Sequence, residues 1–218
     1  MSFLKCRGFL FDMDGVLVNS HAVVDRTWRR WAARHAMDPD PIIAVAHGRR
    51  TSDTLRDIAP HLDIAAEVQW LDEAERDDLD GVVAMPGAVA ILTHLPGVAW
   101  AVVTSCGDAL ARARLEAAGL PIPRVLIASE RIDRGKPFPD GYLAGARGLR
   151  LAPTDCIVFE DTPPGIQAGL VAGAQVVGLS TTYDAGHLTA ATRVVRDLSE
   201  VHVGRAGAAT GDFHVLLG

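Results

Sequence analysis

The sequence predicts an α/β protein whose core is a doubly wound parallel sheet. Short runs of valine, isoleucine, leucine and phenylalanine recur along the chain, and they are continuous rather than alternating with polar residues. Continuous apolar runs indicate strands that are covered on both faces, as strands of a parallel sheet are. Helix-like segments separate the runs, and strand alternating with helix is the pattern of βαβ units. One long stretch without any such run predicts, in addition, an inserted helical subdomain.

Five apolar runs are the expected strands. They lie at the start of residues 8–20, which read GFLFDMDGVLVNS, and within residues 100–105, 124–129, 156–161 and 175–181. Helices are expected over about residues 88–94, 108–118, 140–148 and 164–172. Glycine, proline or polar residues bound each run, so the strands are expected to be short. The segment FHVLLG, residues 213–218, has the composition of one more short strand.

The stretch from about residue 20 to residue 84 has no strand-like run. Bulky side chains recur there at the spacing of one helix face. They are Val24, Trp28, Trp31 and His35 in one segment and Ile64, Val68 and Leu71 in another. We therefore expect residues 1–18 and 86–218 to form the core domain and residues 19–85 a helical cap subdomain, with hinges near residues 16–20 and 85–87. The alternative is a single domain with two ordinary crossover helices.

The bulk composition is that of an ordinary globular protein. Of 218 residues, 49% are hydrophobic and 22% are charged, and the net charge is −6. This negative balance argues against nucleic acid as a partner, because a basic surface supplies most of that affinity. The three cysteines have neither disulfide-framework nor zinc spacing, and the sequence has no signal-peptide layout and no run of membrane-spanning length. We expect a cytoplasmic protein without nucleic-acid or membrane partners, and a monomer is the default state.

Asp12 and Asp14 follow the first apolar run, and Gly15 comes directly after Asp14. Residues i and i+2 of an extended chain point to the same side, so both carboxylates can address one substrate atom. One can serve as nucleophile and the other as proton carrier, provided that a cation keeps the first ionised. Acids also end strands without any catalytic role, so this pattern alone leaves both interpretations open.

Two further polar groups are expected at the same edge of the sheet, because ligands of open parallel sheets bind beyond the carboxyl ends of the strands. Thr104 and Ser105 end the second run, where hydroxyls and the N–H groups of the next helix suit a phosphate. An ordinary N-cap is the alternative. Lys136 is one of only two lysines and lies between glycine and proline. A rigid ammonium there would offset the charge of the aspartates and of a phosphate, whereas the alternative is a solvated surface lysine.

Glu160 and Asp161 end the fourth run, after four apolar residues. Adjacent carboxylates at a sheet edge suit Mg²⁺, which prefers carboxylate and water oxygens. We expect Mg²⁺ to be held by Asp12, Asp161 and Glu160, so that the metal and Lys136 make the buried carboxylates tolerable. Solvated loop acids are the alternative.

Together these motifs resemble those of the haloacid dehalogenase-like superfamily. A DxDG motif, a hydroxyl after an apolar strand, a lysine in GKP and a late ED pair occur in the order typical of that family, over nearly the whole chain. The segments HGRRTSDTL, MPGA, WAVVTS, RGKPFPD, EDTPPGI and VVGLSTTYD are similar to the branch of sugar-phosphate and glycerol-phosphate phosphatases. The resemblance implies a Rossmann-like core with the small helical cap of β-phosphoglucomutase-like members.

The resemblance also implies a role for each motif residue. Asp12 would attack phosphorus and form an aspartyl-phosphate, while Asp14 would act as general acid and then base and bind Mg²⁺ through its backbone carbonyl. Asp161 would bind the metal directly, and Glu160 through a water molecule.

The phosphoryl oxygens would be held by Thr104, with Ser105, and by Lys136. Thr104 is the preferred phosphate-binding hydroxyl, although the end of the strand decides between the two. In the cap, Arg49 is the leading candidate for contacting the organic part of the substrate, followed by Asn19 and His47.

The expected activity is Mg²⁺-dependent hydrolysis of a small sugar or polyol phosphate. The alternative is a phosphosugar mutase of the β-phosphoglucomutase type, which shares every core motif. A phosphonate-cleaving relative would need a lysine in the cap, and residues 20–84 contain none. A dehalogenase would not need the acid pair Glu160 and Asp161, which this chain has. A non-catalytic binding module would most easily arise by loss of Asp12, Asp14 or Lys136, and all three are present.

Overall fold

The computed structural model describes residues 3–205 and 212–218 and contains a six-stranded parallel sheet. The strand order is β6 (Leu126–Ile127), β5 (Trp100–Val103), β2 (Gly8–Phe11), β7 (Cys156–Glu160), β8 (Gln175–Leu179) and β9 (Arg193–Val195). All five neighbouring pairs are parallel. The predicted doubly wound α/β fold is confirmed, and β2, the strand that precedes the paired aspartates, lies in the interior of the sheet.

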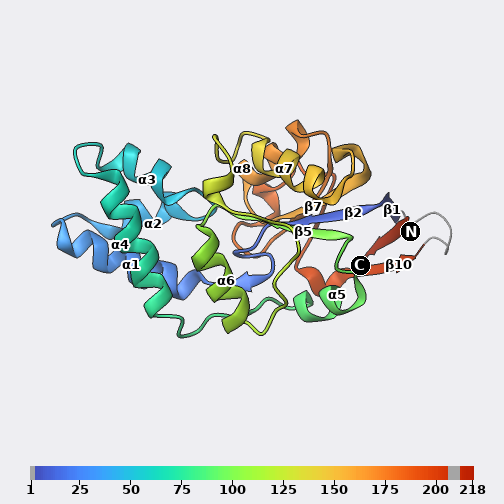
Figure 1. The fold of residues 1–218 in the computed structure, drawn as a ribbon, viewed down its shortest axis with the longest axis horizontal. Coiled ribbons are helices and arrows are strands. Elements are labelled where there is room, and N and C mark those ends of the chain that lie inside the picture. Colours follow the sequence, from blue (N-terminus) through green and yellow to red (C-terminus); the bar gives the residue numbers. More distant parts are fainter. Residues whose placement is uncertain (1–2, 206–211) are drawn as a thin grey trace.

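Helices cover both faces of the sheet (Figure 1). One face packs against α7 (Asp140–Leu149) and α8 (Pro163–Val171), in a core that includes Leu10, Val158 and Tyr142. The opposite core contains side chains of α5 (Ala88–His94) and α6 (Asp108–Ala117). Because the strands are buried on both sides, they read as continuous apolar runs in the sequence.

A small antiparallel sheet extends the second core. Its order is β1 (Phe3–Cys6), β11 (Phe213–Leu217) and β10 (Val201–Arg205). Phe213 contributes to the core beside Phe9, with ring centroids 5.1 Å apart. Of these strands only β11 was predicted. The remaining short elements are the 3₁₀ helices η1 (Ser129–Arg131), η2 (Pro153–Asp155), η3 (Ala185–His187) and η4 (Leu198–Glu200).

The stretch without strand-like runs forms four helices, which we call the helical insert. They are α1 (His21–Arg34), α2 (Pro39–Ala46), α3 (Thr51–Ile58) and α4 (Ile64–Asp77). The chain enters and leaves the insert through a two-stranded antiparallel ribbon, β3 (Val18–Asn19) with β4 (Val83–Ala84). Two of the helices, α2 and α3, carry no periodic pattern that the sequence analysis used.

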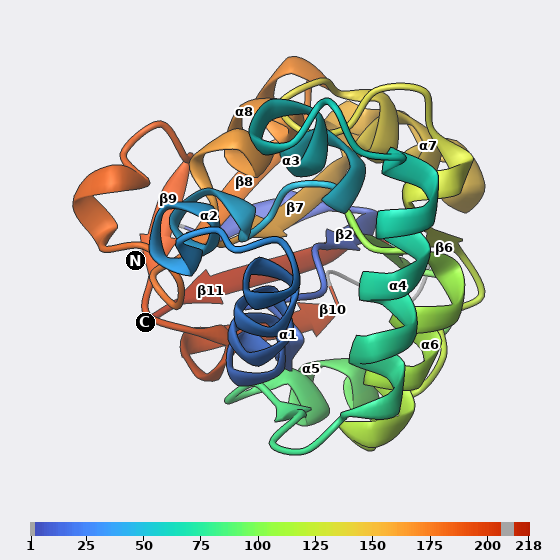
Figure 2. The ribbon, with the colours of Figure 1, turned by 90° about the vertical axis from the view of Figure 1, so that its left-hand side faces the viewer.

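The helical insert has an apolar core of its own, separate from the two cores of the sheet. Trp28 and Trp31 of α1 pack there with Leu55 of α3 and Leu71 of α4. Two aspartates cap its helices, since Asp38 accepts from the N–H of Asp40 and Asp63 accepts from the N–H groups of Ala65 and Ala66. Seen from its own side, the insert lies in front of the strands of the sheet (Figure 2). Among the described residues, no helix combines the length and the apolar character needed to cross a membrane.

The chain passes from the insert back to the sheet domain through Gly87, which precedes α5 and has φ at +84°. A Cβ added there would lie 2.3 Å from the backbone carbonyl carbon of Leu198 and 2.3 Å from the backbone nitrogen of Ser199. Gly81 has nearly the same φ, +81°, but no atom lies within 4 Å of its added Cβ. A comparison of substitutions at the two glycines therefore separates the cost of the left-handed backbone conformation from the cost of close packing.

We expect Gly87→Ala to lower the free energy of unfolding by about 3 kcal/mol or more, because about 1–2 kcal/mol of left-handed strain adds to overlap with the backbone of η4. Gly81→Ala should lose only the strain, about 1–2 kcal/mol. Urea unfolding of both variants measures the difference. Equal losses would contradict the close approach of α5 and η4.

Candidate active site

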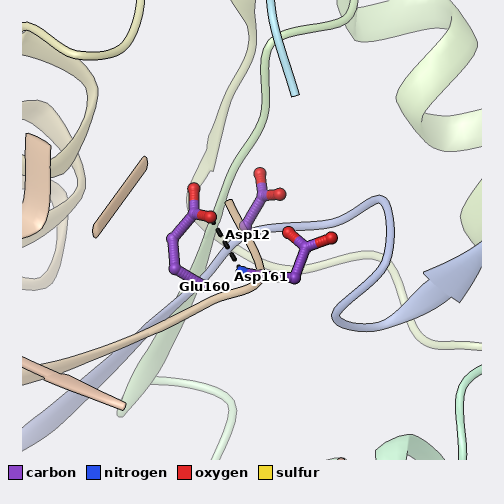
Figure 3. A group of neighbouring side chains, drawn as sticks. All are labelled: Asp12, Glu160 and Asp161. Carbon is purple, nitrogen blue, oxygen red and sulfur yellow. Dashed lines mark hydrogen bonds between the residues drawn. The ribbon is translucent and has the colours of Figure 1, made fainter. Parts of the chain in front are cut away.

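The predicted site residues from three strands meet at the carboxyl edge of the sheet. Asp12 follows β2 and its N–H donates to the carbonyl of Phe159 on β7, at 3.0 Å. Thr104 follows β5, and Glu160 ends β7 with Asp161 next to it. Because β2 pairs with both β5 and β7, all three strand ends lie side by side. Figure 3 shows the carboxylates of Asp12, Glu160 and Asp161 gathered there.

Lys136 lies between two of these carboxylates. Its ammonium is 2.6 Å from Oδ1 of Asp12 and 2.5 Å from Oε1 of Glu160. The side chains are 6%, 4% and 0% exposed, respectively, so water screens the ion pairs little. Burial alone would lower the pKa of Lys136, but the two carboxylates outweigh it and raise the pKa above its usual range. The lysine is therefore a fixed positive charge beside Asp12.

Glu160 is held rigidly through both of its carboxylate oxygens. Oε2 accepts from the N–H groups of Asp161 and Thr162, each at 2.9 Å, and from the Thr162 hydroxyl. Oε1 accepts from the Tyr142 hydroxyl at 2.9 Å in addition to its pairing with Lys136. Gly165 makes room for this carboxylate, because a Cβ there would lie 1.6 Å from Oε1. In this arrangement Glu160 orients Lys136 and the loop that carries Asp161.

Asp12 and Asp161 carry more buried charge than the lysine compensates. Burial is the main cause that raises the pKa of Asp12 to about 7 and the pKa of Asp161 well above its usual range, and Glu160 raises both further. Oδ2 of Asp161 accepts a short hydrogen bond from Thr182, while Oδ1 is buried without a hydrogen-bond partner among the described residues.

One carboxylate oxygen from each of Asp12, Glu160 and Asp161 lies within 4.8 Å of the others, and all three residues are buried. An unpartnered buried carboxylate oxygen beside two further carboxylates fits a divalent cation with oxygen ligands. The residues present could therefore hold Mg²⁺.

Asp14 lies in a different environment, at the mouth of the site. Its side chain is 24% exposed, and Oδ1 accepts from the Ser20 hydroxyl at 2.6 Å and from Nη1 of Arg114 at 2.7 Å. Arg114, on α6, also forms a short ion pair with Glu75 of α4. The sequence analysis missed both partners, because Arg114 reads as an ordinary helix charge and Glu75 belongs to an acidic run that is typical of a solvated face.

The two candidate phosphate-binding hydroxyls point to different neighbours. Oγ1 of Thr104 lies 3.3 Å from the N–H of Cys106, from which it accepts, and the residue is buried. The hydroxyl of Ser105 donates to the backbone carbonyl of Gly48 in the helical insert, at 3.0 Å. Ser105 also lines the cavity between the insert and the sheet, together with Asp12, Asp14 and Asp161.

Of the three predicted cap residues, two line the cavity and one does not. Arg49 and His47 line the same cavity, Arg49 paired with Asp57 at 2.6 Å and His47 lying 3.6 Å from Asp25. Asn19 is exposed on β3, where its side chain accepts from the N–H of His21, and it does not line the cavity.

Arg50, which the sequence analysis did not select, joins the insert to the sheet domain. Its guanidinium pairs with Asp53 at 2.7 Å and donates to the backbone carbonyl of Asp133 at 3.1 Å, in the loop that leads to Lys136.

Comparison with known proteins agrees with this geometry. Residues 6–173 match the family model described as haloacid dehalogenase-like hydrolase. The chain is 43% identical to hexitol phosphatase A of Escherichia coli over 92% of this chain and 95% of that protein. It is 33% identical to glycerol-1-phosphate phosphohydrolase 2 of Saccharomyces cerevisiae, over 96% and 89% of the two chains. The crystal structure of a hydrolase from Pseudomonas syringae superposes with a TM-score of 0.79 at 27% identity, covering 88% of this chain and 94% of that one.

We expect Asp161→Asn to stabilise the metal-free protein relative to the parent, and increasingly so at higher pH. Because the folded chain raises the pKa of Asp161, it keeps a proton that the unfolded chain has already released. The carboxyl group therefore destabilises the fold as pH rises from about 4 upward. At about pH 8 the gain should be about 1 kcal/mol or more, since one pKa unit is worth about 1.4 kcal/mol.

Urea unfolding in the presence of a chelator, at several pH values, measures this difference between variant and parent. Added Mg²⁺ should stabilise the parent more than the variant. A difference that does not change with pH would mean that Asp161 carries no unfavourable buried charge.

Proposed function

The chain belongs to the haloacid dehalogenase-like hydrolases, and on that premise we propose that it is a Mg²⁺-dependent phosphatase that hydrolyses a small sugar or polyol phosphate. One observation carries the proposal: Asp12, held by Lys136, lines a cavity together with Asp14 and Asp161. The proposed nucleophile, the proposed proton carrier and a candidate cation site thus face the same space. This combination supports phosphomonoester hydrolysis through an aspartyl-phosphate.

Mg²⁺ would be held by carboxylate oxygens of Asp12 and Asp161 and by the backbone carbonyl of Asp14. Glu160 has both oxygens engaged by the protein, which favours an indirect, water-mediated role. When bound, the metal would supply positive charge that offsets the phosphate and the buried carboxylates. Lys136 supplies the same kind of charge from the protein itself.

In the proposed reaction, an oxygen of Asp12 attacks phosphorus while the bond from phosphorus to the ester oxygen breaks. Asp14 gives its proton to the leaving alkoxide, which departs as the free alcohol. Asp14 then takes a proton from the water that attacks the aspartyl-phosphate, so inorganic phosphate leaves and Asp12 is restored. Lys136 and the hydroxyls of Thr104 and Ser105 would hold the phosphoryl oxygens as their charge redistributes.

Residues 19–85 would act as the cap over residues 1–18 and 86–218. The separate apolar core of the helical insert supports this division. Polar contacts join the insert to the sheet domain, among them Ser105 with Gly48, Arg114 with Glu75, and Arg50 with Asp133, and the residues of the first two contacts line the cavity. Closure of this kind excludes water from the reaction and commits the substrate. Arg49 and His47, which line the cavity, would contact the organic part.

The substrate class is supported by the relatives and by the lining of the cavity. The similar proteins named above are phosphatases of hexitol and glycerol phosphates. Imidazole, hydroxyl and carboxylate groups of the insert and its entry line the cavity, among them Ser20, His21, His47 and Thr51. Such groups pair with hydroxyls, which suits a small polyol or sugar phosphate.

Asp12→Asn should lower phosphate release from a panel of hexitol, glycerol, hexose and pentose phosphates by about a thousandfold or more, because the nucleophile is lost. The thermal midpoint should not fall, since the substitution removes a buried charge. Asp77→Asn, at an exposed aspartate of α4, is the matched control and should retain full activity. If the parent releases phosphate from no substrate at millimolar Mg²⁺, the proposed function is wrong.

The same chemistry with a sugar hydroxyl in place of water would be that of a mutase, and the products separate the two. With β-glucose 1-phosphate we expect inorganic phosphate and no glucose 6-phosphate, because the similar proteins named above are phosphatases. Product analysis by phosphorus NMR measures this. Accumulation of glucose 6-phosphate without inorganic phosphate would assign the mutase reaction instead.

A further inference from the structure

The cavity that Asp12 and Asp14 line also holds a buried ion pair between Glu75 and Arg114, and Arg114 contacts Asp14 as well. Both side chains line the cavity, and they are 9% and 4% exposed, respectively. Glu75 comes from α4 of the helical insert, whereas Arg114 comes from α6 of the sheet domain. The apolar side chains of Trp28 and Leu110 line the same cavity. The organic part of a bound phosphate ester would therefore meet this pair.

The positive charges that line the cavity are already matched by carboxylates of the protein. Arg114 pairs with both Asp14 and Glu75. Arg49 pairs with Asp57 at 2.6 Å. His21, which also lines the cavity, has its pKa lowered mainly by burial, so it adds no charge at neutral pH or above. His47 lies 3.6 Å from Asp25. Among the described residues that line this cavity, each arginine and His47 thus has a carboxylate neighbour of the protein.

An anionic group on the substrate's organic part would in addition be repelled by Glu75. Like charges a few ångströms apart, away from bulk water, interact strongly because the medium screens them little. A hydroxyl group at the same place could instead donate a hydrogen bond to the Glu75 carboxylate. Charge-assisted bonds of this kind are among the stronger ones in proteins.

We propose that Glu75, oriented by Arg114, is a specificity-determining residue that admits neutral polyhydroxylated alcohols and rejects phosphate esters that carry a carboxylate. The proposal rests on the phosphatase function above and goes further, because it assigns the choice of substrate to one side chain of the insert. Asp14 shares Arg114 with Glu75, so the selecting residue and the proposed acid–base residue belong to one hydrogen-bonded chain. Glu75 would thus contact the leaving alcohol close to the group that protonates it.

Two matched pairs of substrates test the proposal, because each pair differs only by a terminal CH₂OH or carboxylate. They are sorbitol 6-phosphate with 6-phosphogluconate and sn-glycerol 1-phosphate with D-3-phosphoglycerate. Assays belong above pH 7, because burial raises the pKa of Glu75 to about 7. In the parent we expect kcat/KM to favour the neutral member of the better pair by about tenfold or more, a step worth about 1.4 kcal/mol.

Glu75→Gln keeps the length of the side chain and an oxygen for Arg114 but removes the charge. It should reduce this preference to about threefold or less, mainly through a lower KM for the carboxylate-bearing ester. The activity on p-nitrophenyl phosphate, which has neither hydroxyls nor a carboxylate, should change by less than about threefold. Glu73→Gln removes the same charge from the exposed face of α4, two residues away, and should keep the parent's preference.

Each outcome decides the question. An unchanged preference in Glu75→Gln, an equal loss on all substrates, or a parent that does not favour the neutral esters would overturn the proposal. A uniform loss would show that Glu75 serves the fold or the placement of Asp14 and not selection. If the parent releases phosphate from other monoesters but fails these tests, the proposed phosphatase function stands and only the role of Glu75 is wrong.

Discussion

The structure depends on one electrostatic constraint, the burial of three carboxylates around a single ammonium group. Asp12, Glu160 and Asp161 are all nearly inaccessible to water, and Lys136 pairs directly with only the first two. Removing charges from water is unfavourable unless partners compensate them closely. Here the compensation is incomplete, as the raised pKa values of Asp12 and Asp161 indicate. The site therefore keeps uncompensated negative charge, which a bound divalent cation would offset.

The sheet makes this arrangement possible because it fixes the backbone on every side of the charges. Asp12 leaves a strand that is hydrogen-bonded to β5 and to β7, and Glu160 still belongs to β7. Four donors from Asp161, Thr162 and Tyr142 then hold the Glu160 carboxylate, which in turn holds Lys136. A carboxylate fixed in this way cannot move to screen a neighbour. The rigidity keeps Asp12 close to a cation and leaves one oxygen of Asp161 without a protein partner.

The sequence revealed the parts of the site that chain connectivity determines. Parallel strands end at one edge, so the motifs at Asp12, Thr104 and Glu160–Asp161 could be placed together once the runs before them were recognised as strands. Lys136 was identifiable because lysine is scarce in this chain and this one is flanked by glycine and proline. Arg114 and Glu75 could not be found in this way, since their contact joins two helices from different parts of the fold, and sequence spacing says nothing about such a meeting. Strand β10 was missed for the same reason, because it is defined by its pairing with β11.

The sheet domain and the helical insert differ in how strongly the fold constrains their polar side chains. In the sheet domain Lys136 and Glu160 each have several buried partners, so removing either side chain would leave a buried charge or donor unmatched. The helical insert is held together by its own apolar core around Trp31 and Leu71, and of the residues that line the cavity only a few, such as Trp28, also belong to that core. The polar residues of its inner surface are therefore less tightly constrained by the fold. The proposed chemistry thus lies on the sheet, and the proposed selection among alcohols lies on helices that meet the sheet through polar contacts. Arg114 is the point where the two are joined, because one guanidinium serves the proposed acid–base residue of the sheet domain and the selecting residue of the insert.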